Sequence, residues 1–144
     1  MYEIYKDLNT DVARAGIYAS LGDGLKTGVT TSNDLWYPHP VGVTGLVDAE
    51  IEAARELGIR FHPVRAYHSV TSDIVPPEVV DTTEGVMADA ERLVKKYHDP
   101  SRFSMCQVGI GPSIAQYETE EIVRATVDLA EKLDIMVHGH LAES

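Results

Sequence analysis

An alternation of helical and strand-like patterns, repeated four times, constrains this chain more than any other feature. Apolar residues recur at helical spacing in the ranges 2–26, 46–57, 86–97 and 122–133. Short apolar or β-branched runs follow them at 28–34, 59–67, 103–110 and 134–140. Connections this short favour right-handed crossovers between parallel strands. The sequence therefore predicts an α/β fold with a parallel sheet.

The length of 144 residues indicates one domain, 1–144, and falls short of the roughly 250 residues of a complete eight-stranded barrel. The periodicity alone fits both an open sheet and a segment of a barrel. The glycine pattern G-x-G-x-x-G of dinucleotide-binding sheets and the phosphate-binding loop pattern are both missing from the sequence. A nucleotide-binding sheet is therefore disfavoured.

Charge and cysteine content limit the partners and the compartment. Twelve Lys and Arg against 23 Asp and Glu give a net charge of −11, which disfavours nucleic acid and anionic membranes as partners. The single cysteine, Cys106, has no partner for an internal disulfide. The sequence contains neither a signal peptide nor a long apolar run, so we expect a cytoplasmic protein.

The densest cluster of chemically active residues is His138, His140 and Glu143. Residues two apart on a strand face the same side, so both imidazoles can point into one site, with Glu143 returning from the following loop. Imidazoles bind Zn²⁺ or Fe²⁺, and a nearby carboxylate can move protons during hydrolysis. From this pattern alone, a metal role and two purely structural histidines both stay open.

Several motifs together resemble the metal-dependent amidohydrolase superfamily. They are the run 138–143 (His-Gly-His-Leu-Ala-Glu), the run 27–34 (Thr-Gly-Val-Thr-Thr-Ser-Asn-Asp), the run 58–65 (Gly-Ile-Arg-Phe-His-Pro-Val-Arg) and Tyr-His-Asp at 97–99. The likeness is closest to the deaminase and chlorohydrolase branch, which includes 8-oxoguanine deaminase and the s-triazine hydrolases. It covers nearly the whole chain, and the order of the motifs is more specific than any one of them.

The resemblance implies a segment of a distorted TIM-type (β/α)₈ barrel, with four parallel βα units that would hold its second to fifth strands. It implies that His140 is a metal ligand and that Glu143 is the general acid/base. The cofactor would be one divalent metal ion, Zn or Fe. The other ligands of the family come from strands outside this chain, so we expect a fragment that is inactive alone. Reading His138 and His140 as the first-strand pair is rejected, because four βα units precede them.

Three further residues are predicted to bind substrate. His138 is either a substrate-facing residue or a packing residue. Arg65 lies at the carboxyl end of the predicted third strand and would orient a carbonyl or carboxylate of the substrate, or else form an ion pair within this acidic chain. Ser113 lies where many relatives carry His or Cys after a proline, which puts an 8-oxoguanine substrate in doubt.

The remaining candidates have weaker expectations. His62 is expected in the core or an interface, Asp34 in a hydrogen bond, and Cys106 as a small buried residue. His39 and His68 lie in loops on the face where barrel active sites form. Trp36 and Tyr37 would line a pocket for a flat ring or form a subunit contact, and the sequence leaves this choice open.

The function implied by the resemblance is hydrolytic deamination of an amino-substituted heterocycle, either 8-oxoguanine-like or a triazine or pyrimidine. The alternatives are an amide or carbon–halogen hydrolase of the same superfamily, and a non-catalytic α/β binding module. Four strands cannot close a barrel of eight, so sheet edges would stay exposed. We therefore expect self-association into a homo-oligomer or poor solubility.

Overall fold

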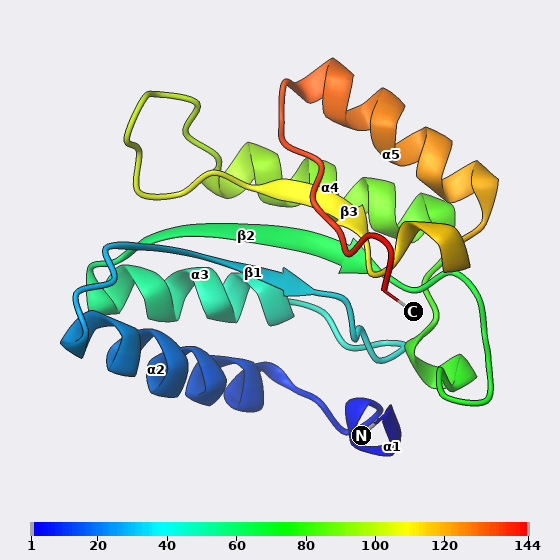
Figure 1. Ribbon diagram of the computed structural model, residues 1–144, viewed down its shortest axis with the longest axis horizontal. Coiled ribbons are helices and arrows are strands. Elements are labelled where there is room, and N and C mark those ends of the chain that lie inside the picture. The colour runs from blue at the N-terminus through cyan, green and yellow to red at the C-terminus, as the bar shows by residue number, and fades with distance from the viewer. Residues whose placement is uncertain (1, 144) are drawn as a thin grey trace.

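The computed structural model describes residues 2–143 and shows helices and parallel strands in alternation (Figure 1). The main helices begin and end close to the predicted ranges, with Gly58 closing the second of them in a left-handed conformation (φ 74°). In chain order the elements are α1 (Tyr2–Tyr5), α2 (Thr10–Lys26), β1 (Thr31–Trp36), α3 (Leu46–Leu57), β2 (Arg60–Tyr67), η1 (Pro77–Val79), α4 (Thr83–Tyr97), β3 (Gly109–Pro112), η2 (Ala115–Tyr117) and α5 (Glu120–Leu133).

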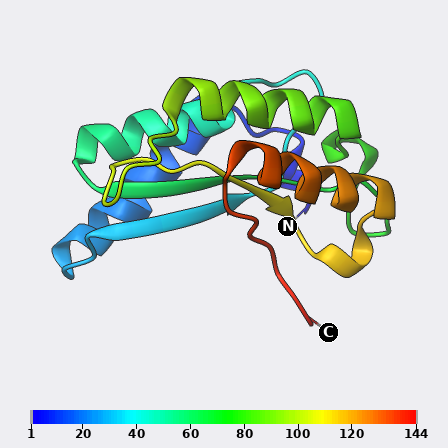
Figure 2. The same ribbon diagram turned by 90° about the horizontal axis from the view of Figure 1, so that it is seen from above.

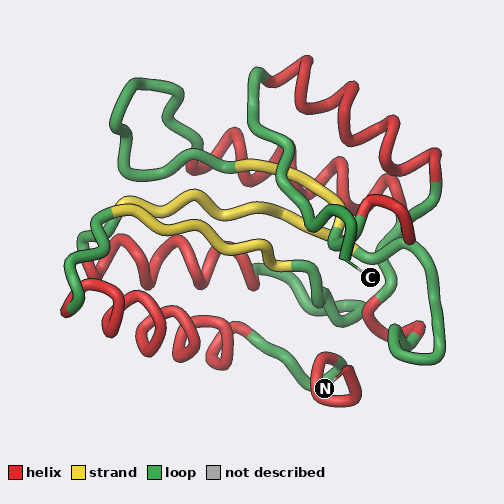
Figure 3. Tube along the Cα trace, viewed as in Figure 1, coloured by secondary structure: helices red, strands yellow, loops and turns green. Residues whose placement is uncertain are grey.

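The three strands form one parallel sheet in the order β1-β2-β3, which confirms the predicted α/β fold with a parallel sheet (Figure 3). Trp36 pairs with Arg65, and Tyr67 pairs with Pro112, so the carboxyl ends of all three strands meet at one edge. Helices α3, α4 and α5 lie along one side of the sheet (Figure 2).

The core lies between the sheet and these helices. Alternate residues of β2, such as Phe61 and Tyr67, are buried against them, because side chains alternate between the two faces of a strand. One cluster joins α2, α3 and the end of α4 to the sheet, and a second joins the first half of α4 and α5 to the ends of β2 and β3. Their largest fully buried side chains include Phe61, Ile51, Leu93, Tyr67, Ile110 and Ile122.

The predicted helix 2–26 is wrong in its first part, because it is two helices. The Asn9 side chain accepts hydrogen bonds from the backbone N–H groups of Asp11 and Val12, and so starts α2 afresh. The next predicted strand, 28–34, begins later than expected. Gly28 has a φ of 93° and belongs to the turn after α2, so β1 starts at Thr31.

The predicted strand 103–110 is also wrong in its first part. Phe103 has a φ of 66° and belongs to a turn, in which the Ser104 N–H donates to the carbonyl of Ser101. Cys106 makes one isolated parallel bridge with Phe61, and the continuous strand β3 is only Gly109–Pro112. The apolar run alone did not indicate this turn.

The predicted strand 134–140 lies beside β3 as two isolated parallel bridges, Ile110 with Val137 and Ile114 with His140. The N–H of His138 donates to the carbonyl of Ile110 at 3.1 Å. The next donor of a regular parallel ladder would be residue 112, and Pro112 has no N–H. Pairing resumes one residue later, where the N–H of His140 donates to the carbonyl of Ser113 at 3.0 Å.

Two glycines allow this segment to approach β3. A Cβ on Gly111 would lie 1.7 Å from the carbonyl oxygen of His138, and one on Gly139 would lie 2.6 Å from that of Pro112. Both distances are shorter than atoms tolerate, so any larger side chain would displace the final segment. These glycines therefore fix where His138 and His140 lie.

Candidate active site

His140 is held by a single backbone carbonyl at the carboxyl end of β3. The oxygen of Ser113 accepts one hydrogen bond from the His140 N–H, at 3.0 Å, and a second from the ring Nδ1, at 2.8 Å. A carbonyl oxygen only accepts, so the ring proton is on Nδ1 and the lone pair is on Nε2. Histidines that bind metals typically donate their second ring N–H in this way, which fixes the ring and its tautomer.

His138 carries the opposite tautomer. The Asn33 Nδ2 group donates to its Nδ1 atom at 3.0 Å, which places the ring proton on Nε2. His138 is therefore set to donate a hydrogen bond, whereas His140 is set to offer a lone pair. Of the two imidazoles, His140 is the one whose Nε2 is prepared to bind a metal.

The contact between Asn33 and His138 also shows that the sheet is strongly curved. Asn33 is on β1, and His138 lies beyond β3, three strand positions away. In a flat sheet such positions would be about 14 Å apart, too far for an asparagine and a histidine to meet. Curvature of this kind is what a barrel wall requires.

Glu143 reaches a cavity of about 560 Å³ at the carboxyl ends of the strands. Its backbone carbonyl accepts from Gln116 Nε2 at 3.3 Å and from the Tyr117 hydroxyl at 3.5 Å, which ties the final segment to η2. Figure 2 shows the final segment leaving the side of β3 and running away from the sheet. The cavity is lined by His68, Val70, Ser72, Asp73, Ile74, Val75, Ile114, Tyr117, Glu118 and Glu143.

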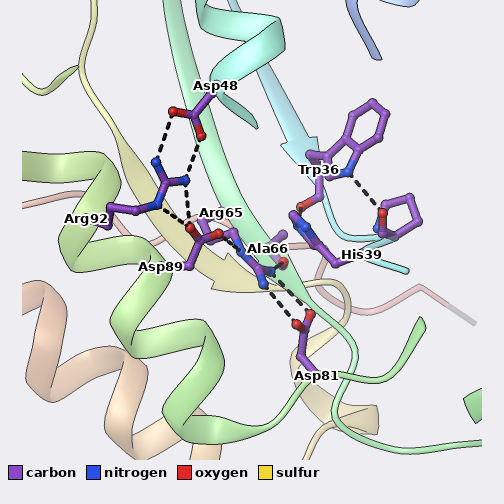
Figure 4. Close-up of polar contacts among 9 residues, drawn as sticks. Trp36, His39, Asp48, Arg65, Ala66, Asp81, Asp89 and Arg92 are labelled. Atoms are coloured by element: carbon purple, nitrogen blue, oxygen red, sulfur yellow. Dashed lines mark hydrogen bonds and ion pairs between the residues drawn. The ribbon is translucent and has the colours of Figure 1, made fainter. Parts of the chain in front are cut away.

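Tyr37 connects His140 to this cavity. Its ring lies edge-on to His140, with centroids 6.3 Å apart, and edge-on to the cavity residue His68, with centroids 5.0 Å apart. Trp36, the preceding residue, packs instead against the helix-side core and donates its indole N–H to the carbonyl of Pro38 (Figure 4). The two neighbouring aromatic residues therefore have different roles, and Tyr37 is the one beside the site.

Glu118 is a site residue that the sequence analysis missed. Its Oε2 accepts from the backbone N–H of Ser69 at 2.5 Å and from the Ser69 hydroxyl at 2.7 Å. Its Oε1 lies 3.5 Å from Nδ1 of His68. Glu118 thus ties the loop after β2 to the segment before α5, a long-range contact that no local pattern in the sequence indicates.

Arg65 is occupied by ion pairs on the helix side of the sheet (Figure 4). Its guanidinium contacts Asp89 of α4 at 2.8 Å and Asp81 at 2.9 Å, and it also donates to the carbonyl of Ala66 at 2.5 Å. The side chain is only 4% exposed. This geometry corresponds to the ion-pair alternative that the sequence left open for Arg65, in which carboxylates of the chain itself hold the guanidinium.

The ion pairs continue from Arg65 into α3. Asp89 also contacts Arg92, and Arg92 contacts Asp48 at 2.6 Å. Burial opposes ionisation of Asp48, but hydrogen bonds from Arg92, Lys96 and Tyr97 outweigh it and lower the pKa of this carboxyl. The network joins α3, α4 and β2 behind the site.

His39 follows β1 and is buried near Arg65. Its Nε2 donates to the carbonyl of Trp36 at 3.1 Å (Figure 4). Burial, reinforced by the positive charge of Arg65, lowers the pKa of His39 well below its usual value. His39 is therefore a neutral structural histidine at physiological pH.

A buried carboxyl group, Glu50, close to the half-buried Asp34, is a second feature that the sequence analysis missed. Glu50 of α3 is 0% exposed, and neither carboxyl oxygen has a hydrogen-bond partner within residues 2–143. Burial, and then the interaction with Asp34 on β1, raise the pKa of Glu50 well above its usual value. Asp34, for which a hydrogen bond was expected, thus influences a buried acid on the helix side of the sheet.

Two minor expectations concern β2 and the segment before β3. His62 is half-buried on β2, where burial lowers its pKa. Cys106 is buried as predicted, and burial raises the pKa of its thiol to about 11. Neither residue lines the cavity that contains Glu143.

A metal site would need ligands beyond those found here. Within residues 2–143 no group of three or more His, Cys, Asp or Glu side chains is arranged to hold a metal ion. His140 offers one prepared nitrogen, whereas a zinc site usually has three or four protein ligands. Across the same residues, no helix has the length and hydrophobicity that crossing a membrane demands.

Comparison with known proteins decides the family. A model of the amidohydrolase family matches residues 3–144, nearly the entire chain. The chain belongs to the amidohydrolase family. Among curated amidohydrolases it is 29% identical to an 8-oxoguanine deaminase of Pseudomonas aeruginosa, covering 100% of this chain and 33% of the relative. It is 31% identical to a hydroxydechloroatrazine ethylaminohydrolase of Pseudomonas sp. (strain ADP), covering 99% of this chain and 31% of the relative.

Solved amidohydrolase structures agree. The atrazine chlorohydrolase TrzN of Arthrobacter aurescens TC1, complexed with zinc, superposes with a TM-score of 0.88 at 29% identity. The superposition covers 96% of this chain and 32% of that enzyme. This amidohydrolase chain therefore spans about a third of the length of its relatives. The predicted likeness to the deaminase and chlorohydrolase branch is confirmed.

Proposed function

We propose that this chain is the second to fifth βα units of a metal-dependent amidohydrolase that deaminates an amino-substituted heterocycle by hydrolysis. The single observation that carries the proposal is the preparation of His140. Its Nδ1 proton is held by the Ser113 carbonyl, and Glu143 follows three residues later at the rim of a cavity. Deaminases and a triazine hydrolase among the relatives support this choice of reaction.

The residues fit one half of a metal centre. His140 would offer Nε2 to a divalent ion, and the zinc complex of the related chlorohydrolase supports zinc. When bound, such an ion lowers the pKa of water, so that a nucleophile is available near neutral pH. The other ligands would come from strands outside this chain, so residues 1–144 alone would be inactive.

Glu143 would be the proton carrier. It would take a proton from the attacking water, pass one to a ring nitrogen, and deliver one to the departing amine. Overall, the amino-substituted ring and water give the ring carbonyl compound and ammonia. A carboxylate at the rim of the cavity can reach both the ring and the leaving group.

The other two predicted substrate residues would act from nearby. His138, with its proton on Nε2, would donate a hydrogen bond to the substrate or to a neighbouring side chain. Ser113 would act through its backbone, because its carbonyl orients His140. We also propose that the enzyme is cytoplasmic, acts on a small heterocycle, and self-associates.

The test is metal content together with ammonia release. The experiment uses a longer protein that contains this chain within a complete barrel, loaded with zinc and offered aminopurines, aminopyrimidines and aminotriazines. We expect ammonia from at least one class, and loss of both metal and ammonia release in His140→Ala. The control is His62→Gln, which should keep both. A His140→Ala variant that retains full metal and full activity would contradict the proposal.

A further inference from the structure

A second cavity, of about 500 Å³, lies between α2 and β1 and shares no lining residue with the cavity beside Glu143. Glu50 of α3 and Asp34 of β1 both line it. Glu50 is 0% exposed, and within residues 2–143 neither of its carboxyl oxygens has a hydrogen-bond partner. Buried carboxyl groups in proteins are normally paired or hydrogen-bonded. The partner of Glu50 is therefore expected from outside these residues.

The charge around this second cavity is of one sign. Its lining contains the carboxyl groups of Asp34 and Glu50 and, among the described residues, neither Lys, Arg nor His. Two carboxyl groups that lie close together in a site with little water oppose each other's ionisation, and a cation between them relieves this repulsion. The group that complements the cavity best is therefore positively charged.

A cationic side chain fits the second cavity better than a free metal ion does. Within residues 2–143 no group of three or more His, Cys, Asp or Glu side chains is arranged to hold a metal ion. The ammonium of Lys or the guanidinium of Arg needs only oxygen acceptors such as those of Glu50 and Asp34, and its apolar stem packs against hydrophobic surface. Such surface is provided by Ala13, Ile17, Leu21, Val29, Trp36 and Phe61.

The edge of the sheet at β1 shows where this side chain would enter. β1 pairs with β2 on one side, and on its other side there is no strand of the described chain (Figure 3). A closed barrel requires a strand there, and the chain spans only about a third of the length of its relatives. Neighbouring strands lie about 4.8 Å apart, so a side chain level with Asp34 on the helix-facing side of that strand would reach Glu50.

We propose that Glu50 and Asp34 bind a lysine or arginine side chain from the strand beside β1, which a part of the polypeptide outside residues 1–144 contributes. The proposal rests on the complete barrel of the proposed function and is independent of the reaction. The ion pair would join two neighbouring βα units on the helix side of the barrel wall. It would also keep Glu50 ionised, because a buried charge is tolerated when it is paired and hydrogen-bonded.

Infrared spectroscopy of the longer protein tests the charge of Glu50 directly. A protonated carboxyl group has a carbonyl stretching band that a carboxylate lacks. At neutral pH, Glu50→Gln should therefore remove carboxylate bands from the spectrum of the parent and leave the protonated carboxyl region unchanged. Loss of a protonated carboxyl band in Glu50→Gln would overturn the proposal, because it would show that no cation is paired with Glu50.

Thermal unfolding of the longer protein is the second measurement. Glu50→Gln should lower the midpoint Tm by about 5 °C, because the buried cation loses its charged partner. In residues 1–144 alone, which hold no strand beside β1, the same substitution should instead increase stability at neutral pH. Glu52→Gln is the matched control, because Glu52 is on the same helix with its side chain 52% exposed, and it should keep the parental Tm.

The remaining outcomes all count against the proposal. An unchanged or higher Tm of Glu50→Gln in the longer protein would overturn it. A lower Tm whose size depends on the concentration of K⁺ or Mg²⁺ would overturn it too, because this result would identify a free ion as the partner. Ammonia release, measured separately, tests the proposed function, and its failure would leave the infrared and unfolding results unaffected.

Discussion

Replacing Glu50 by glutamine should make the protein more stable at neutral pH. Glu50 is 0% exposed, and burial together with Asp34 raises the pKa of its carboxyl well above its usual value. Glutamine has nearly the same shape and carries no charge, so the substitution removes the ionisation while preserving the packing. We expect this substitution to change the free energy of unfolding by more than most substitutions of surface residues do.

The sign follows from where the proton is bound. Above the ordinary pKa of glutamic acid, the unfolded chain gives up the Glu50 proton while the folded chain keeps it. The protonated Glu50 therefore makes its full contribution to the free energy of unfolding at acidic pH. This contribution falls by about 1.4 kcal/mol for each pH unit as the pH rises toward the raised pKa. While the pH lies between the ordinary and the raised pKa of Glu50, the parent loses this stability and the Glu50→Gln variant keeps it.

The assay is urea unfolding followed by the fluorescence of Trp36, the single tryptophan, from about pH 5 to about pH 8. The free energy of unfolding of Glu50→Gln should exceed that of the parent by a margin that grows with pH. Glu52→Gln is the control, because Glu52 is on the same helix with its side chain 52% exposed, and it should follow the parent. Parallel curves for the parent and Glu50→Gln would refute the reasoning.

Three other predictions come from the ion pairs, the glycines and the sheet edges. Arg65→Met should lower the free energy of unfolding by roughly 3 kcal/mol in the same assay, because Asp81 loses its cationic partner and Asp89 keeps only Arg92; a loss below about 0.5 kcal/mol, as for an ordinary surface change, would contradict this. Gly111→Ala should displace the final segment and lower metal affinity, because the new Cβ would lie 1.7 Å from the carbonyl oxygen of His138. Gly16→Ala is the control, because a Cβ on Gly16 has no atom within 4 Å. Equal metal affinity of the two variants would count against the packing described. Residues 1–144 expressed alone should associate in gel filtration, and elution as a stable monomer would argue against an incomplete barrel wall.

Periodicity predicted the helices well because their apolar stripes face one layer. α3, α4 and α5 each bury such a stripe, and Gly58 ends α3 as its position indicates. The strand ends were harder to predict. An apolar run cannot reveal that Phe103 adopts a positive φ, or that Pro112 interrupts the ladder with the final segment. These features depend on neighbouring strands rather than on local sequence.

Site residues that belong to a sequence motif were predicted, whereas residues defined by tertiary contacts were not. His140 and Glu143 were named from the motif, and the structure adds the Ser113 carbonyl that sets the tautomer of His140. Glu118 and Glu50 were missed, because their partners are distant in sequence or belong to another element. Residues of this kind can be recognised only once the fold shows which side chains lie beside them.

The most direct test of the account concerns the carboxyl group of Glu143. The measurement is ammonia release by the zinc-loaded longer protein carrying Glu143→Gln, compared with Glu131→Gln on the exposed face of α5. If Glu143 moves the proton, Glu143→Gln should keep its metal and lose turnover by about 100-fold or more, while Glu131→Gln stays at the parental rate. Parental turnover by Glu143→Gln would contradict the account.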